Sequence, residues 1–129
     1  GKDENYYYQG SEMRNIYITV NANDWEWNED TETYDFIANV PELTTKIYND
    51  GAYTASVFLY PKTSDERAEL LPYLFTYWAK DQNNMDYTYT ENISCFFRPN
   101  VVGFSIQTSD RGEGEPNNYQ FKITLMWNN

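Results

Sequence analysis

Hydrophobic and polar residues alternate along several short stretches of the chain, a pattern typical of β-strands with one buried face. The clearest case is the last stretch, in which every second residue is large and apolar: Tyr119, Phe121, Ile123, Leu125 and Trp127. About seven strands are expected in all, at residues 16–20, 34–40, 52–60, 70–79, 86–98, 101–108 and 119–127. Turn residues separate these stretches at fairly regular intervals. The pattern predicts an all-β fold, a single antiparallel β-sandwich with Greek-key or immunoglobulin-like strand order.

Three prolines help to place the ends and edges of these strands. Pro41 and Pro61 each follow a strand and end it, because proline has no amide hydrogen to donate to a β-ladder. Pro72 lies inside an apolar run, which favours an edge strand or a β-bulge at that place. Residues 62–69 are charged and are predicted to form a solvated loop, in which residues 65–69 could add a helical turn.

The spacing of the apolar residues changes between residues 43 and 50. Leu43 and Ile47 lie four positions apart, as on one face of a helix, so one short helix is expected near residues 43–50. Thr44 is the expected N-cap of this helix. Gly51 is expected to end it in a left-handed conformation.

The first part of the chain lacks a consistent period. Residues 1–13 are expected to form an N-terminal tail or tether, and residues 14–129 to form one β-sandwich domain. The tyrosines at positions 6–8 are a weak candidate for a contact surface within this tail. Elsewhere, no apolar run approaches the roughly 18–20 residues that a helix needs to span a membrane.

The composition shows that the chain is rich in aromatic rings and strongly acidic. Nineteen per cent of the residues are aromatic, and such rings supply a large buried area for a core. Twenty acidic residues against nine basic ones give a net charge of −11. Such a surface repels phosphate backbones and anionic headgroups. We therefore expect no nucleic-acid partner, and contact with a membrane only through an N-terminal lipid anchor.

The sequence lacks the side chains on which most catalytic and metal sites depend. There is no histidine and one cysteine, Cys95, which lies in a predicted strand and is interpreted as a structural thiol. Zinc and iron sites use histidine or several thiolates, so we expect no metal and no cofactor. The protein is predicted not to be an enzyme. A glycoside hydrolase is the less favoured alternative, because its candidate carboxylates, such as Asp24 and Glu26, lie in one loop rather than on separate strands.

Two tryptophans stand in a turn-rich, acidic stretch at residues 21–33, outside the predicted strands. Sugar rings stack on exposed aromatic planes, while neighbouring carboxylates and amides bind their hydroxyl groups. Trp25, Trp27, Asp24 and Glu26 are therefore the candidate ligand-binding residues. The alternative is that one tryptophan folds back into the core and the other lies on a sheet edge.

Several segments resemble a family of small uncharacterised lipoproteins from the cell envelopes of Gram-negative gut anaerobes. The segments that carry the resemblance are residues 16–20, Asp24-Trp25, residues 34–44, residues 51–60, Leu71-Pro72-Tyr73 and residues 121–123. These segments mark strands and turns and do not form a catalytic motif. The resemblance implies a β-sandwich domain anchored by a lipidated N-terminal cysteine, without catalytic residues.

The charged start of the chain bears on localisation. Lys2-Asp3-Glu4 is similar to the lysine and acidic signal that follows the lipidated cysteine in surface-exported lipoproteins of such bacteria. We expect an outer-membrane surface lipoprotein with a soluble domain. Its expected function is the non-enzymatic binding of an extracellular ligand, either a glycan or a protein. The alternative is an accessory subunit of an envelope complex, assembled through the Pro72 edge or the aromatic N-terminus.

Overall fold

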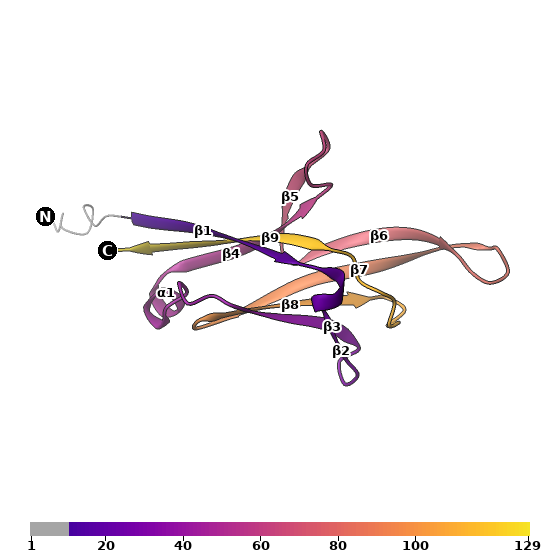
Figure 1. Cartoon of the computed structure of the whole chain (residues 1–129), viewed down its shortest axis with the longest axis horizontal. Coiled ribbons are helices and arrows are strands. Elements are labelled where there is room, and N and C mark those ends of the chain that lie inside the picture. Colours follow the sequence, from indigo (N-terminus) through magenta and orange to yellow (C-terminus); the bar gives the residue numbers. More distant parts are fainter. Residues whose placement is uncertain (1–10) are drawn as a thin grey trace, which may run out of the picture.

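A computed structural model describes residues 11–129 of the chain as two antiparallel β-sheets that face each other (Figure 1). The four-stranded sheet has the order β1 (Ser11–Val20), β9 (Tyr119–Asn128), β4 (Ala52–Leu59) and β5 (Arg67–Leu70). The five-stranded sheet has the order β2 (Glu26–Asn28), β3 (Thr33–Asn39), β8 (Val101–Thr108), β7 (Asp86–Arg98) and β6 (Tyr73–Lys80). Two short helices, η2 (Ala22–Asp24) and α1 (Thr45–Asp50), complete the fold. The predicted all-β sandwich with one short α-helix is confirmed.

The seven expected strands are all present, and the structure adds two that the pattern did not predict. The first is β2, three residues that pair with β3. The second is β5, which occupies part of the segment predicted to be a charged loop or helical turn. It pairs with β4 from Ser56–Leu70 to Leu59–Arg67. Both lie at sheet edges, where one side of the strand faces solvent and charged residues are tolerated.

The N-terminal boundary of the domain also differs from the prediction. Strand β1 begins at Ser11 and pairs with β9 from its first residue, Ser11 opposite Asn128. Residues 11–13, predicted to belong to the tail, are therefore part of the sheet. Residues 1–10, including the tyrosines at positions 6–8, lie outside the described residues.

The core fills the space between the inner faces of the two sheets. Phe104 of β8 and Phe121 of β9 stack across the sandwich with ring centroids 4.1 Å apart, and neither ring is exposed. Other large, fully buried side chains come from both sheets and from the segment before α1: Leu43, Ile93, Ile123 and Leu125. The inward positions are those that the alternating pattern predicted, because a strand buries every second residue.

Helix α1 begins as predicted but ends differently. The Thr44 hydroxyl oxygen accepts a hydrogen bond from the Ile47 amide at 3.2 Å, so the N-cap is confirmed. Gly51 has a φ of −96°, which is not left-handed, and that part of the prediction is wrong. A glycine is needed there for space, since a Cβ atom would lie 2.5 Å from the carbonyl oxygen of Met126.

Strand β6 is the outermost strand of the five-stranded sheet, and Pro72 directly precedes it. The edge position predicted from this proline is confirmed. Strands β6 and β7 form a long hairpin that extends past the end of the four-stranded sheet (Figure 1). The segment 109–118, which connects β8 to β9, lies over the five-stranded sheet near the base of this extension.

Cys95 lies on β7 and packs against the buried core while remaining half-buried. Burial raises the pKa of its thiol to about 11. A thiol with such a pKa is almost fully protonated at neutral pH and is a poor nucleophile. These properties agree with a structural role.

Candidate functional site

Trp25 belongs to the core. Its side chain is only 6% exposed, and it makes edge-to-face contacts with Phe36, Tyr119 and Phe121 at centroid distances of 6.3, 5.8 and 6.3 Å. A ring enclosed in this way presents no face to a ligand. The two tryptophans therefore do not form a paired stacking surface. Trp25 folds back into the core and Trp27 lies on the edge strand β2, so the alternative interpretation is confirmed.

The other three predicted residues are divided between the surface and a cavity. Asp24 is exposed, and its carboxylate accepts a hydrogen bond from the Asn21 amide at 2.8 Å across helix η2. Glu26 is also exposed, on the edge strand β2. Trp27 is half-buried and lines a cavity together with Tyr34, whose ring centroid lies 5.0 Å away. Of the four candidates, only Trp27 contributes to this cavity.

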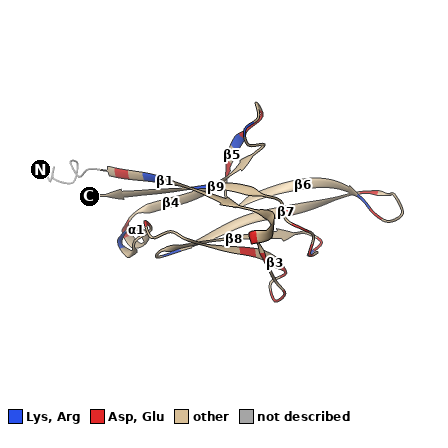
Figure 2. Cartoon of the chain, viewed as in Figure 1, with Lys and Arg blue, Asp and Glu red and all other residues tan. Residues whose placement is uncertain are grey.

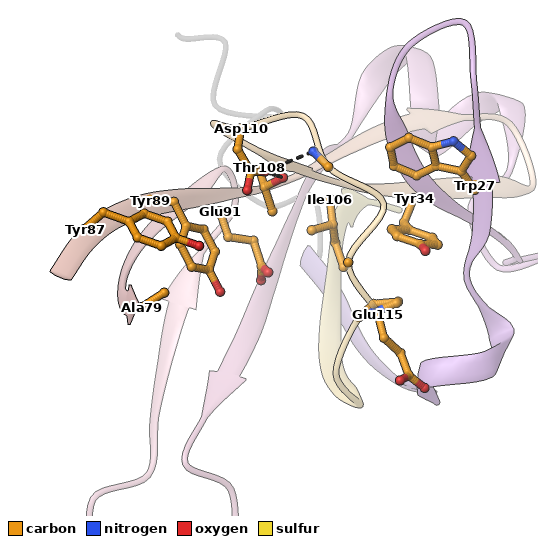
Figure 3. Close-up of a pocket in the computed structure, with 13 residues that line it drawn as sticks. Trp27, Tyr34, Ala79, Tyr87, Tyr89, Glu91, Ile106, Thr108, Asp110 and Glu115 are labelled. Atoms are coloured by element: carbon orange, nitrogen blue, oxygen red, sulfur yellow. Dashed lines mark hydrogen bonds between the residues drawn. The ribbon is translucent and has the colours of Figure 1, made fainter. Parts of the chain in front are cut away.

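The cavity has a volume of about 210 Å³ and lies at one end of the five-stranded sheet (Figure 3). Its floor is the inner face of strands β3, β8 and β7, and the segment 109–118 forms the opposite wall. Four aromatic side chains line it: Trp27, Tyr34, Tyr87 and Tyr89. Three carboxylates also line it: Glu91, Asp110 and Glu115. The site therefore combines aromatic rings from β2, β3 and β7 with one carboxylate from β7 and two from segment 109–118.

Hydrogen bonds fix the wall formed by segment 109–118. The Tyr34 hydroxyl donates to the carbonyl oxygen of Glu113 at 3.1 Å. The Asp110 carboxylate accepts from the Thr108 hydroxyl at 2.6 Å and from the Gly112 amide at 2.9 Å. These two hydrogen bonds, that of Thr108 first, lower the pKa of Asp110. Asp110 is therefore a fixed, ionised group at the rim of the cavity.

Glu91 is the deepest polar group of the site. Its side chain is on the inner face of β7 and the residue is 8% exposed. One carboxylate oxygen, Oε1, accepts a hydrogen bond from the Tyr119 hydroxyl of the opposite sheet. The other oxygen, Oε2, accepts none from the described residues. Burial raises the pKa of Glu91, and the hydrogen bond from Tyr119 only partly opposes this effect.

The tyrosines around Glu91 remain neutral at physiological pH. Burial, and then the charge of Glu91, raise the pKa of Tyr89. Burial also raises the pKa of Tyr34, with a further contribution from Glu113 and Glu115. Tyr77 stacks on Tyr89 with centroids 5.2 Å apart, and its pKa is raised to about 12, chiefly by burial. Tyr34 and Tyr89 line the cavity and offer π faces and hydroxyl groups to a ligand, whereas Tyr77 supports Tyr89 from outside the cavity.

The arrangement is suited to recognition. Aromatic faces take the apolar faces of a small ring, and the carboxylates accept hydrogen bonds from hydroxyl or ammonium groups. Within residues 11–129, no three acidic or cysteine side chains come close enough together to hold a metal ion. The same residues contain no helix long and apolar enough to cross a membrane.

Sequence reasoning missed most of the cavity because its residues come from β3, β7, β8 and the segment after β8, which only the fold brings together. One feature of the sequence did indicate this cavity, the presence of an acid among the inward residues of β7. Glu91 stands in the inward series of β7, between Tyr89 and Ile93, where every second residue is otherwise aromatic, apolar or Cys95. An acid at an inward strand position indicates a buried polar site, because burial of a carboxylate is costly without a role that requires it.

We expect Glu91→Gln to make the domain more stable at neutral pH. The pKa of Glu91 is raised in the folded state, so the fold binds this proton more tightly than the unfolded chain does. The resulting stabilisation is complete below the unfolded pKa of glutamate and is lost as pH rises through the folded pKa. Glutamine cannot titrate, and its carbonyl oxygen still accepts the hydrogen bond from Tyr119.

The measurement is denaturant unfolding at several values between about pH 5 and pH 8. The wild type should lose stability with rising pH relative to the variant. Asp65→Asn is the control, because Asp65 is an exposed acid in the connection between β4 and β5. A Glu91→Gln variant that is less stable than the wild type throughout this range would show that ionised Glu91 stabilises the fold.

Comparison of the chain with protein-family models, with curated proteins and with solved structures found no match.

Proposed function

We propose that this domain is a non-enzymatic binding module that takes an extracellular glycan into the cavity beside Trp27, while an N-terminal lipid anchor holds it at the outer-membrane surface. The observation that carries the proposal is the combination of aromatic rings and carboxylates around one cavity. Trp27 and Tyr34 stand at one end and Tyr87 and Tyr89 at the other, with Glu91 between them (Figure 3). Resemblance of Lys2-Asp3-Glu4 to an export signal supports the location.

The size of the cavity supports a small ligand group. Its volume of about 210 Å³ is below the range of roughly 300–1,000 Å³ that encloses drug-sized molecules. The exposed carboxylates Asp110 and Glu115 lie on the wall toward solvent. We propose that the cavity takes one sugar residue of a chain, with the remainder of the glycan in solvent.

We expect Trp27→Ala to weaken glycan binding by about tenfold or more, equivalent to about 1.4 kcal/mol, because it removes an aromatic face of the cavity. Affinity electrophoresis and a glycan array identify the ligand, and calorimetry measures the affinity. The matched control is Trp78→Ala. Trp78 is 78% exposed on the edge strand β6 and does not line the cavity. Glycan binding that survives Trp27→Ala, or that is lost with Trp78→Ala, places the ligand elsewhere.

A second candidate is an accessory subunit that pairs through β6 with another envelope protein. The unpaired edge of an outermost strand offers backbone groups for an added strand. Strand β6 contains no acidic residue, and Lys80 is its only charge (Figure 2). Leu74 and Trp78 are exposed on it, by 59% and 78%. A photo-crosslinker at Trp78 in intact cells tests this function: a single envelope partner, lost with Thr76→Pro, would support it.

A further inference from the structure

We infer that the cavity beside Trp27 selects a ligand with a protonated amine, and that among glycans it takes those with a free, unacetylated amino sugar. This inference rests on the proposed glycan-binding function and specifies its ligand class. It follows from the charges of the lining, from its aromatic faces, and from the burial and hydrogen bonding of Glu91.

The charges that line the cavity have one sign. Glu91, Asp110 and Glu115 contribute carboxylates, and among residues 11–129 no lysine or arginine lines the cavity. The nearest basic residue along the segment is Arg111, which forms an ion pair with Glu32 at 3.3 Å and does not line the site. This lining repels uronic and sialic acids and attracts a cation.

The aromatic lining is suited to the same charge. Tyr34, Tyr87 and Tyr89 surround the acids together with Trp27, and tryptophan provides the strongest cation–π attraction of the aromatic side chains. Burial holds the Tyr34 and Tyr89 hydroxyls in their neutral form, so these rings keep their electron-rich faces without adding charge. An ammonium group placed between such rings and carboxylates loses little of the stabilisation that it has in water.

The position of Glu91 within the cavity also favours a cationic ligand. The residue is more than nine-tenths buried, it faces the cavity, and only one of its two oxygens accepts a hydrogen bond from the described residues. A buried carboxylate is costly unless a cation or several donors accompany it. A neutral hydroxyl group satisfies one acceptor lone pair of Oε2, whereas an ammonium group satisfies the acceptor and also neutralises the charge. An amine is therefore a better partner for this oxygen than a hydroxyl group is.

The test compares two sugars of matched size by calorimetry: the β-1,4-linked disaccharide of glucosamine and its N-acetylated counterpart. The pH is held below that at which the sugar amine loses its proton. We expect the glucosamine disaccharide to bind the wild type at least about tenfold more tightly. Glu91→Gln should remove this preference. Asp65→Asn, which also removes one negative charge but from an exposed loop outside the cavity, should preserve it.

The outcomes separate this inference from the proposed function. Equal binding of the two disaccharides leaves glycan binding intact and overturns the amine inference. Binding of methylammonium, lost with Glu91→Gln, together with no binding of either sugar would support the amine site and overturn the glycan proposal. Equal weakening by Glu91→Gln and Asp65→Asn would show attraction to the net charge alone and would overturn the inference. Should Glu91→Gln misfold, Glu115→Gln, which removes another carboxylate of the cavity, replaces it and should weaken the preference; an unchanged preference would overturn the inference.

Discussion

Trp25→Ala is expected to lower the free energy of unfolding by about 3–5 kcal/mol, the range for loss of a large aromatic side chain from a core. Trp25 fills the space beside Phe36 of the five-stranded sheet and Tyr119 and Phe121 of the four-stranded sheet. Removing its ring opens a cavity where the two sheets meet. The indole Nε1 has no hydrogen-bond partner among the described residues, so the lower part of this range is expected, because one unsatisfied donor is removed with the ring.

Denaturant unfolding measures the effect, and Trp78→Ala is the matched control. Trp78 is the most exposed of the large apolar side chains in the part of the chain that the structure describes, and its loss should change stability by no more than about 0.5 kcal/mol. Trp25→Phe should fall between the two, since it keeps an aromatic ring and removes the unsatisfied donor. If Trp25→Ala costs less than about 1 kcal/mol, the ring is not the enclosed core group described above.

The second large effect is expected at the contact between the sheets. Phe104→Ala and Phe121→Ala should each lower the free energy of unfolding by about 3–5 kcal/mol. Both rings are fully buried and stack at 4.1 Å with an interplanar angle of 16°. Each comes from a different sheet, so each truncation weakens the interface that holds the sandwich together.

A double-mutant cycle tests whether the two rings act as a pair. Aromatic pairs of this kind are worth about 0.5–1.5 kcal/mol beyond their buried area. The double variant should therefore be less destabilised than the two single variants added together, by at least this amount. The reference is a cycle between Phe104→Ala and the exposed Met13→Ala, for which we expect additive effects. Additivity between Phe104→Ala and Phe121→Ala would contradict the stacked geometry.

The alternation of apolar and polar residues predicted the sandwich well, because in a β-strand it reflects which residues are buried. In β9, the inward residues from Tyr119 to Leu125 are all buried, and the alternation marked each of them. Strand β5 lacks this signal, since three of its four residues are exposed and only Glu69 is half-buried. An edge strand of this kind is specified by its pairing with β4, which is a property of the tertiary structure.

The site was predictable only in part, for the same reason. The sequence placed Trp25 and Trp27 together because they are near neighbours in the chain. The fold separates them: Trp25 enters the core, and Trp27 reaches a cavity whose other residues are as distant in sequence as Tyr89 and Glu115. The sequence predicted a combination of aromatic and acidic side chains, and the cavity has such a lining, but strand pairing brings most of its residues together.

Tyr119 connects the core to Glu91 of the cavity beside Trp27, although it does not itself line the cavity. Its hydroxyl donates to Glu91, and its ring packs against Trp25. Substitutions of Tyr119 are therefore expected to disturb the core and the position of Glu91 together. Glu115 and Gly114, in the wall at residues 109–118, do not contribute to the core in this way. Glu115 is exposed, and a side chain at Gly114 would meet open space. We therefore expect sequence changes to be tolerated better in this connecting segment than at Tyr119.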